Sequence, residues 1–176
     1  MRVSLYVGIF FSFPLVVDQS LKAVPADVQF ADSDGGRKSA HADETVSVNL
    51  ARRSILMYRL SQPDNPTELK FQPKYGSIVS YRWYGDGFVL VGFSEGVVVA
   101  VSTVGDKAGE ELHSWSMHDG GLYDLVFCDA LGQFATCGNN QVKITDLNSD
   151  WKARAFIVFF RSVFSIPHLL AFTLAV

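Results

Sequence analysis

The chain has little of what disulfide-stabilised or nucleic-acid-binding proteins need. Among its 176 residues are only two cysteines, Cys128 and Cys137, which are too few for a disulfide framework, so we expect free, buried thiols in a reducing compartment. The formal net charge is -3, and no basic cluster is longer than Arg52-Arg53. This charge pattern predicts no nucleic-acid partner.

Catalytic signatures are absent as well. The sequence has no phosphate-binding loop, no dinucleotide-binding glycine fingerprint and no nucleophile elbow. Its four histidines are too far apart for a compact ligand motif: His41, His113, His118 and His168. We therefore predict no catalytic, cofactor-binding or metal-binding residues, no cofactor and no small-molecule substrate.

A strand pattern does repeat, with a spacing of about 45 residues. Residues 86–92 and 97–103 correspond to residues 131–138 and 142–147, and a partial copy lies upstream at residues 46–60. This period is typical of the blades of a β-propeller. Because closed propellers have about four to eight blades, the chain length predicts either a piece of a larger ring or blades that find partners elsewhere.

The blades can be placed from apolar strand segments and from the turn residues that bound them. We expect a hairpin over residues 46–60, followed by a breaker-rich connection over residues 62–66. It is preceded by a polar inter-strand insertion or linker over residues 27–44, within which residues 32–39 are expected to form an exposed loop. The strands expected in two further blades are Ile78–Trp83, Phe88–Phe93, Val97–Thr103 and Glu111–Met117, then Leu122–Phe127, Phe134–Cys137 and Val142–Thr145. Five aromatic residues are expected to pack between blades: Tyr81, Trp83, Tyr84, Phe88 and Phe93.

One blade carries a degenerate set of structural residues. In WD40 blades, a histidine before the first strand precedes a Trp-Asp pair that closes the third strand, and here Thr145-Asp146 follows His118 at that spacing. Complete repeats also use a Ser or Thr of the second strand and a turn aspartate to satisfy buried polar groups. The corresponding residues here are Thr136 and either Asn139 or Asn140, whereas the tryptophan is missing. We predict a structural blade set of His118, Thr136, Asn139 and Asp146 in an all-β, partial WD40-type β-propeller of about two to three four-stranded antiparallel blades over residues 27–150.

The N-terminal segment, residues 1–26, is apolar. An uncharged run over residues 3–17, with small residues at 24–26 downstream, resembles a secretory signal. Asp18 and Lys22 between these two features favour instead a core strand or a mistaken gene start.

The C-terminal segment, residues 151–176, leaves two interpretations open. Residues 155–176 contain Arg161 as their only charge and are long enough to span a bilayer, which needs about 20 residues. Arg161 and Pro167 weigh against a membrane helix. The alternative is a fourth strand over residues 153–160, followed by residues foreign to the domain.

Five blocks of residues carry a family resemblance. They are LSQPDNP (60–66), YGSIV (75–79), WYGDG (83–87), VGFSEG (91–96) and ATCGNNQVKITDL (135–147). In order and spacing they resemble the large WD40-repeat subunit of intraflagellar transport complex A. The resemblance covers residues 46–147 well and residues 19–44 only faintly.

The resemblance implies a non-catalytic scaffold with tandem N-terminal propellers and a long helical-repeat tail. It implies a role in retrograde transport, in cilium assembly and in the delivery of membrane proteins into cilia. The implied partners are other complex A subunits, and the implied location is the cilium and cytoplasm, at the ciliary base and axoneme. Because several blades and the helical tail are missing, we expect a truncated or mis-spliced product. The second hypothesis is a membrane-anchored or secreted β domain held by its terminal apolar segments, and membrane contact stays open.

Overall fold

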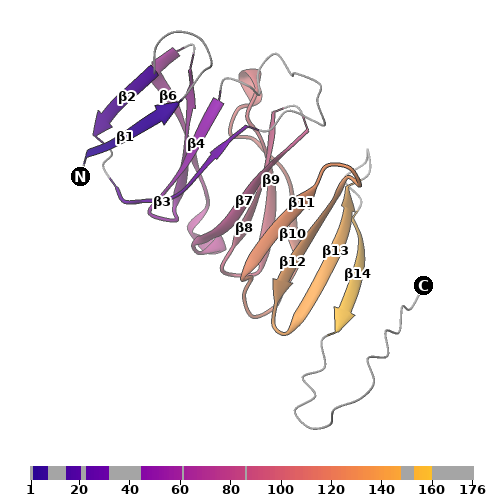
Figure 1. Ribbon diagram of the computed structural model, residues 1–176. Coiled ribbons are helices and arrows are strands. Elements are labelled where there is room, and N and C mark those ends of the chain that lie inside the picture. The colour runs from indigo at the N-terminus through magenta and orange to yellow at the C-terminus, as the bar shows by residue number, and fades with distance from the viewer. Residues whose placement is uncertain are drawn as a thin grey trace, which may run out of the picture.

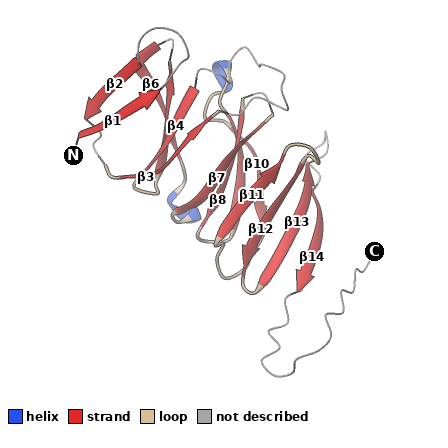
Figure 2. Cartoon of the chain, in the orientation of Figure 1, coloured by secondary structure: helices blue, strands red, loops and turns tan. Residues whose placement is uncertain are grey.

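Three four-stranded sheets follow one another along the chain (Figure 1). The structure, a computed structural model, describes residues 2–7, 15–20, 23–31, 45–60, 62–85, 87–147 and 153–159. Each sheet connects its strands in sequence order with antiparallel pairing. Strands dominate the described residues, and the helices in Figure 2 are two short 3₁₀ turns, Pro73–Tyr75 and Gly105–Lys107. This is the all-β architecture predicted from the repeat.

The elements have the following bounds. The first hairpin consists of β1 (Arg2–Val7) and β2 (Leu15–Ser20). The first sheet consists of β3 (Pro25–Phe30), β4 (Thr45–Leu50), β5 (Ser54–Arg59) and β6 (Gln62–Lys70). The second sheet consists of β7 (Ile78–Tyr84), β8 (Phe88–Phe93), β9 (Val97–Ser102) and β10 (Glu111–Ser116). The third sheet consists of β11 (Asp124–Cys128), β12 (Gln133–Gly138), β13 (Gln141–Leu147) and β14 (Ala153–Phe159).

Backbone conformations at the turns explain why the strands reverse where they do. Gly96 between β8 and β9 has a φ of 81°, and the turn between β12 and β13 places Asn139 and Asn140 at φ 48° and 58°. Glycine and asparagine tolerate this left-handed region better than other residues. The turn between β4 and β5 instead uses Ala51 and Arg52 at φ 49° and 59°, although neither residue is a usual choice there.

The second sheet is enclosed because its two faces pack against different neighbours. Along β8, Val89 and Val91 face the first sheet, where they join a core with Ile55 and Met57. The alternate residues of β8 and β9 face the third sheet, in a second core that contains Leu90, Val98, Ala100, Leu122, Leu125 and Phe134. Successive side chains of a strand point to opposite faces, so the alternation along each strand directs side chains into both cores. Among the aromatic residues expected between blades, Tyr81, Trp83 and Phe93 are buried.

The connection expected over residues 62–66 is instead the start of an edge strand, β6. In the ladder with β5, Met57 pairs with Thr67 and Arg59 pairs with Gln62, and the register shifts between these two pairs. The two prolines of β6 therefore lie where the ladder is interrupted. Proline is tolerated at an edge strand or bulge because no ladder hydrogen bond is lost there.

The polar insertion or linker expected from residue 27 onward begins within a strand. β3 runs from Pro25 to Phe30 and pairs with β4, so the polar residues at its centre belong to the sheet. Most side chains of β3 are exposed. An exposed strand needs no alternation of apolar residues, so its composition resembled that of a loop.

The described parts of the two terminal segments are strands. β1 and β2 form an antiparallel hairpin, and β14 pairs with β13 along its whole length. β14 lies where one of the two interpretations of the C-terminal segment expects a fourth strand, over residues 153–160. Residues 160–176 lie outside the described residues.

The two cysteines are free thiols, as predicted. The expectation that both are buried is wrong for Cys128, which is exposed at the end of β11. Cys137 is half-buried and pairs with Asp124 across the ladder, whereas Cys128 pairs with Gln133. This offset along the two strands keeps the thiols apart.

Candidate functional site

His118 and Thr136 meet at the junction between the second and third sheets. His118 follows β10 and is buried, and its Nε2 atom lies 3.0 Å from Oγ1 of Thr136 on β12. The backbone N–H of His118 donates to the carbonyl oxygen of Gly96 at 3.1 Å. The pair therefore ties the connection between the two sheets to the interior of the third.

Asn139 holds the adjacent turn between β12 and β13. Its side-chain oxygen accepts from the backbone N–H of Gly120 at 2.8 Å, and its nitrogen donates to the carbonyl oxygen of Gly120 at 3.1 Å, in the amide orientation that satisfies both groups. Gly120 lies two residues after His118. Asn139 thus fixes the turn to the segment that carries the histidine.

Asp146 lies toward the other end of the same strands. It pairs with Gln133 at the start of β12, whereas Thr136 pairs with Lys143. The structure thus brings His118, Thr136 and Asn139 to one end of the third sheet and places Asp146 at the opposite end. The joint structural role of these four residues stays a prediction.

Lys143 also belongs to this region, although no sequence motif marks it. Its Nζ donates to the carbonyl oxygen of Met117, the residue before His118. Thr145, two residues later, is fully buried at the position where WD40 blades have tryptophan. Strand alternation places Lys143 and Thr145 on the same, inward face of β13. A charged residue at an inward position of a strand is the sequence signal that could have identified Lys143.

The environment of His118 favours its neutral form. Burial is the largest cause that holds the pKa of His118 below its ordinary value of 6.5, and the nearby Lys143 ammonium acts in the same direction. The hydrogen bond with Thr136 and the charge of Asp119 oppose this shift. Among the described residues, Nδ1 of His118 has no hydrogen-bond partner. A protonated ring would therefore add a charge without a matching acceptor.

We expect the fold to lose stability as the pH falls below about 6.5, because the unfolded chain then takes up a proton at residue 118 more readily than the folded chain. The loss continues until the pH reaches the lowered pKa of the folded state. Urea unfolding at about pH 7.5 and about pH 5.5 measures the effect. His118→Gln, which does not titrate, should show a smaller pH dependence, and an unchanged dependence would contradict this role of His118.

A second buried polar cluster joins the first and second sheets. The Oγ atom of Ser47 lies 3.0 Å from the hydroxyl oxygen of Tyr81 and accepts from Nε1 of Trp83 at 2.9 Å. The Tyr81 hydroxyl also lies 3.1 Å from the carbonyl oxygen of Ser47, to which it donates. Burial raises the pKa of Tyr81 to about 12, so the hydroxyl keeps its proton near neutral pH. No sequence pattern pointed to Ser47.

Ser47→Ala is expected to lower the free energy of unfolding by about 2 kcal/mol, because the buried Trp83 N–H loses its acceptor. Chemical unfolding measures the change. Ser114→Ala, at an exposed position of β10, is the matched control and should change the free energy by less than about 0.5 kcal/mol. Equal effects of the two substitutions would show that the cluster does not stabilise the junction.

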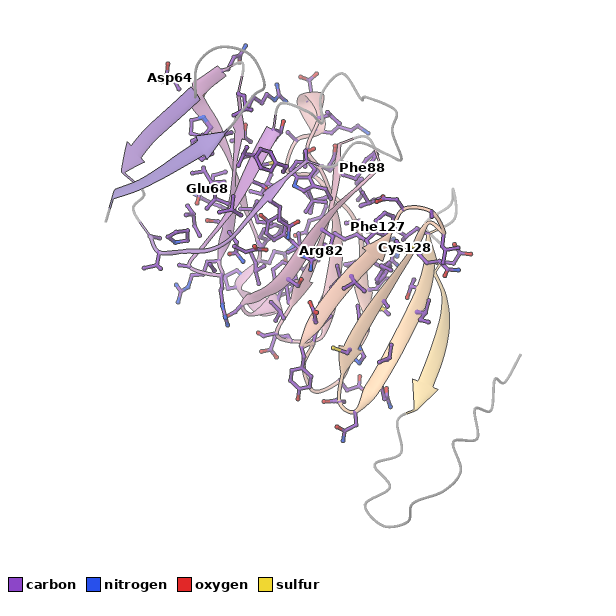
Figure 3. The ribbon with its side chains drawn as sticks, in the orientation of Figure 1. Asp64, Glu68, Arg82, Phe88, Phe127 and Cys128 are labelled. Atoms are coloured by element: carbon purple, nitrogen blue, oxygen red, sulfur yellow. The ribbon has the colours of Figure 1, made fainter. Side chains whose placement is uncertain are left out.

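Three aromatic side chains gather at one end of the second and third sheets. Tyr84 stacks on Phe88 with ring centroids 5.5 Å apart and meets Phe127 edge-on at 5.3 Å. Tyr84 thus contacts both Phe88 of the second sheet and Phe127 of the third, and Figure 3 labels these two phenylalanines. Leu131, in the turn after β11, is 66% exposed. We call Tyr84, Phe88, Phe127 and Leu131 the aromatic rim, and it is a candidate docking surface because propeller turns are free to contact partners.

No group of three or more His, Cys, Asp or Glu side chains within the described ranges is arranged to hold a metal ion. The described part of the chain contains no helix of the length and hydropathy needed to cross a membrane.

Solved structures with the same arrangement of sheets define the class of fold. The chain matches the WD40 β-propeller domain of Doa1 with a TM-score of 0.58 and 13% identity, over 82% of this chain and 44% of that one. It matches a chain of a mitotic checkpoint complex structure with a TM-score of 0.62 and 14% identity, over 85% of this chain and 43% of that one. The fold is therefore a part of a WD40 β-propeller.

Sequence comparison then shows the family. Residues 15–162 match the model of the first β-propeller of WDR19, so the chain belongs to this propeller family. It is 37% identical to mouse and 35% identical to human WD repeat-containing protein 19 over 127 residues, which is 72% of the chain in each case. Identity to the Caenorhabditis elegans WD repeat-containing protein dyf-2 is 32% over 70% of the chain. The chain matches about a tenth of the length of these relatives. The resemblance stated from the sequence blocks is confirmed.

Proposed function

We propose that the chain is a non-catalytic docking module of an intraflagellar transport complex A subunit, acting in retrograde transport, cilium assembly and ciliary membrane-protein trafficking. The match of residues 15–162 to the first propeller of WDR19 carries the proposal. The proposed partners are other complex A subunits, and the proposed location is the cilium, at its base and along the axoneme, and the cytoplasm.

The distribution of polar groups supports a passive role. The buried polar clusters around His118 and Ser47 are used in hydrogen bonds between neighbouring sheets. Groups committed to such bonds stabilise the fold and are not available to a substrate. Contact with partners would then fall to exposed turns and to the aromatic rim.

Affinity purification of the tagged chain from ciliated cells tests this function. We expect complex A subunits to be enriched over an unrelated tagged protein. Gly96→Ala should lose the enrichment because its Cβ atom would clash with the backbone of His118 and prevent folding, and Gly105→Ala, whose Cβ atom would meet no neighbour, should keep it. Equal recovery with the folded and the Gly96→Ala chains would contradict specific docking.

The aromatic rim can be tested in the same assay. Leu131→Asp adds a charge at an exposed position and should reduce recovery of the partners while the chain stays folded. Val24→Asp, at another exposed apolar residue, is the control. If both variants recover partners equally, the rim is not the docking surface.

A further inference from the structure

The third sheet has one apolar face without a neighbouring sheet in the described structure. Val126, Ala135 and Ile144 lie side by side across β11, β12 and β13, and Cys137 pairs with Val142 on the same face. Val126 is 49% exposed and the other four are half-buried. We call these five residues the outer face of the third sheet.

The corresponding face of the second sheet shows how such a surface is covered. Leu90, Val98 and Ala100 occupy the equivalent positions of β8 and β9, and all three are fully buried. They lie under the next segment of the chain, which supplies Leu122 and Leu125 to the same core. A face of this kind is therefore covered by the residues that follow its own outer strand.

The connection from the last strand of one four-stranded sheet to the first strand of the next has the same length at both described junctions. Ile78 begins β7 eight residues after Lys70 ends β6, and Asp124 begins β11 eight residues after Ser116 ends β10. The same spacing after Phe159, the end of β14, reaches Pro167. The sequence after it, HLLAFTLAV (168–176), has no Asp, Glu, Lys or Arg.

We propose that residues 168–176 dock on the outer face of the third sheet, in the place that β11 takes on the second sheet. The segment is tethered to the sheet that it would cover, so a short connection brings it to the face at a small entropic cost. Both surfaces are apolar, and their contact removes both from water. The occupant is this segment of the same chain, and a second copy of the chain is the competing occupant.

Cys137 provides a direct readout because its thiol lies on the outer face. In a Cys128→Ser background, Cys137 is the only thiol, and its rate of reaction with Ellman's reagent measures access to the face. Leu170→Asp places a charge in the proposed contact and should speed the reaction by about tenfold or more, because burying an unpaired carboxylate would oppose docking. A chain that ends at Phe159 should react at the same high rate.

Val24→Asp is the matched control, since Val24 is an exposed apolar residue of the β3 region. It should leave the rate at Cys137 unchanged, and circular dichroism should show unaltered strand content in every variant compared. If Leu170→Asp and the chain ending at Phe159 both react as slowly as the parent, the proposal is overturned. If Cys137 reacts slowly at high protein concentration but fast after dilution, a second copy of the chain covers the outer face, and the proposal is overturned.

Discussion

Gly96→Ala is expected to destabilise the fold by more than about 4 kcal/mol, which is enough to unfold a marginally stable domain. A Cβ atom at this position would lie 1.7 Å from the carbonyl oxygen of His118. This contact is with backbone, so no side-chain rotation can relieve it. The same turn holds the connection between the second and third sheets, because the carbonyl oxygen of Gly96 accepts from the backbone of Met117 and His118 at 2.8 and 3.1 Å.

Gly105→Ala separates the effect of the clash from the effect of backbone conformation. Gly105 has a φ of 63°, and a Cβ atom there would have no neighbour within 4 Å. Only the left-handed backbone conformation is then unfavourable for alanine, and the free energy of unfolding is expected to fall by about 1 kcal/mol. Thermal and chemical unfolding of both variants measure the difference. Similar losses in the two variants would mean that the second and third sheets do not approach at Gly96.

Phe134→Ala is expected to lower the free energy of unfolding by about 4 kcal/mol. The ring is buried in the core between the second and third sheets, where its centroid lies 5.6 Å from that of Trp115. Removing the ring leaves a cavity that the neighbouring strands can fill only in part, because the hydrogen-bond ladders of the second and third sheets hold their backbones in place. The midpoint of urea unfolding measures the loss.

Leu131→Ala is the control for this substitution. Leu131 is 66% exposed, so truncation should change stability by less than about 0.5 kcal/mol. A small effect at Phe134 together with normal strand content would contradict the core between the second and third sheets.

The repeat and the turns allowed much of the fold to be predicted from sequence. The strands of the second sheet were found because short apolar runs rich in β-branched residues are bounded there by Asp-Gly or Glu-Gly turns. β3 was missed because most of its side chains are exposed, and β6 was missed because its ladder with β5 is interrupted where the two prolines lie. The prolines of β6 suggested a connection, although the register shift near Arg59 accommodates them.

The polar clusters were harder to predict because each depends on contacts between distant residues. His118 and Thr136 could be paired from the known spacing of WD40 residues, and the structure places them 3.0 Å apart. Ser47 and Tyr81 are 34 residues apart in sequence, and nothing local to either residue indicates their contact. Lys143 was missed because a lysine on a strand is usually exposed.

Hydrogen exchange of the backbone amides tests most directly whether the second sheet is enclosed between its neighbours. Amides of β8 and β9 should exchange most slowly in the chain, at a rate set by global unfolding, because both faces of these strands are buried. Amides of the edge strand β6 should exchange faster through local opening. Exchange of β8 and β9 as fast as that of β6 would contradict the stacking of three sheets into part of a propeller.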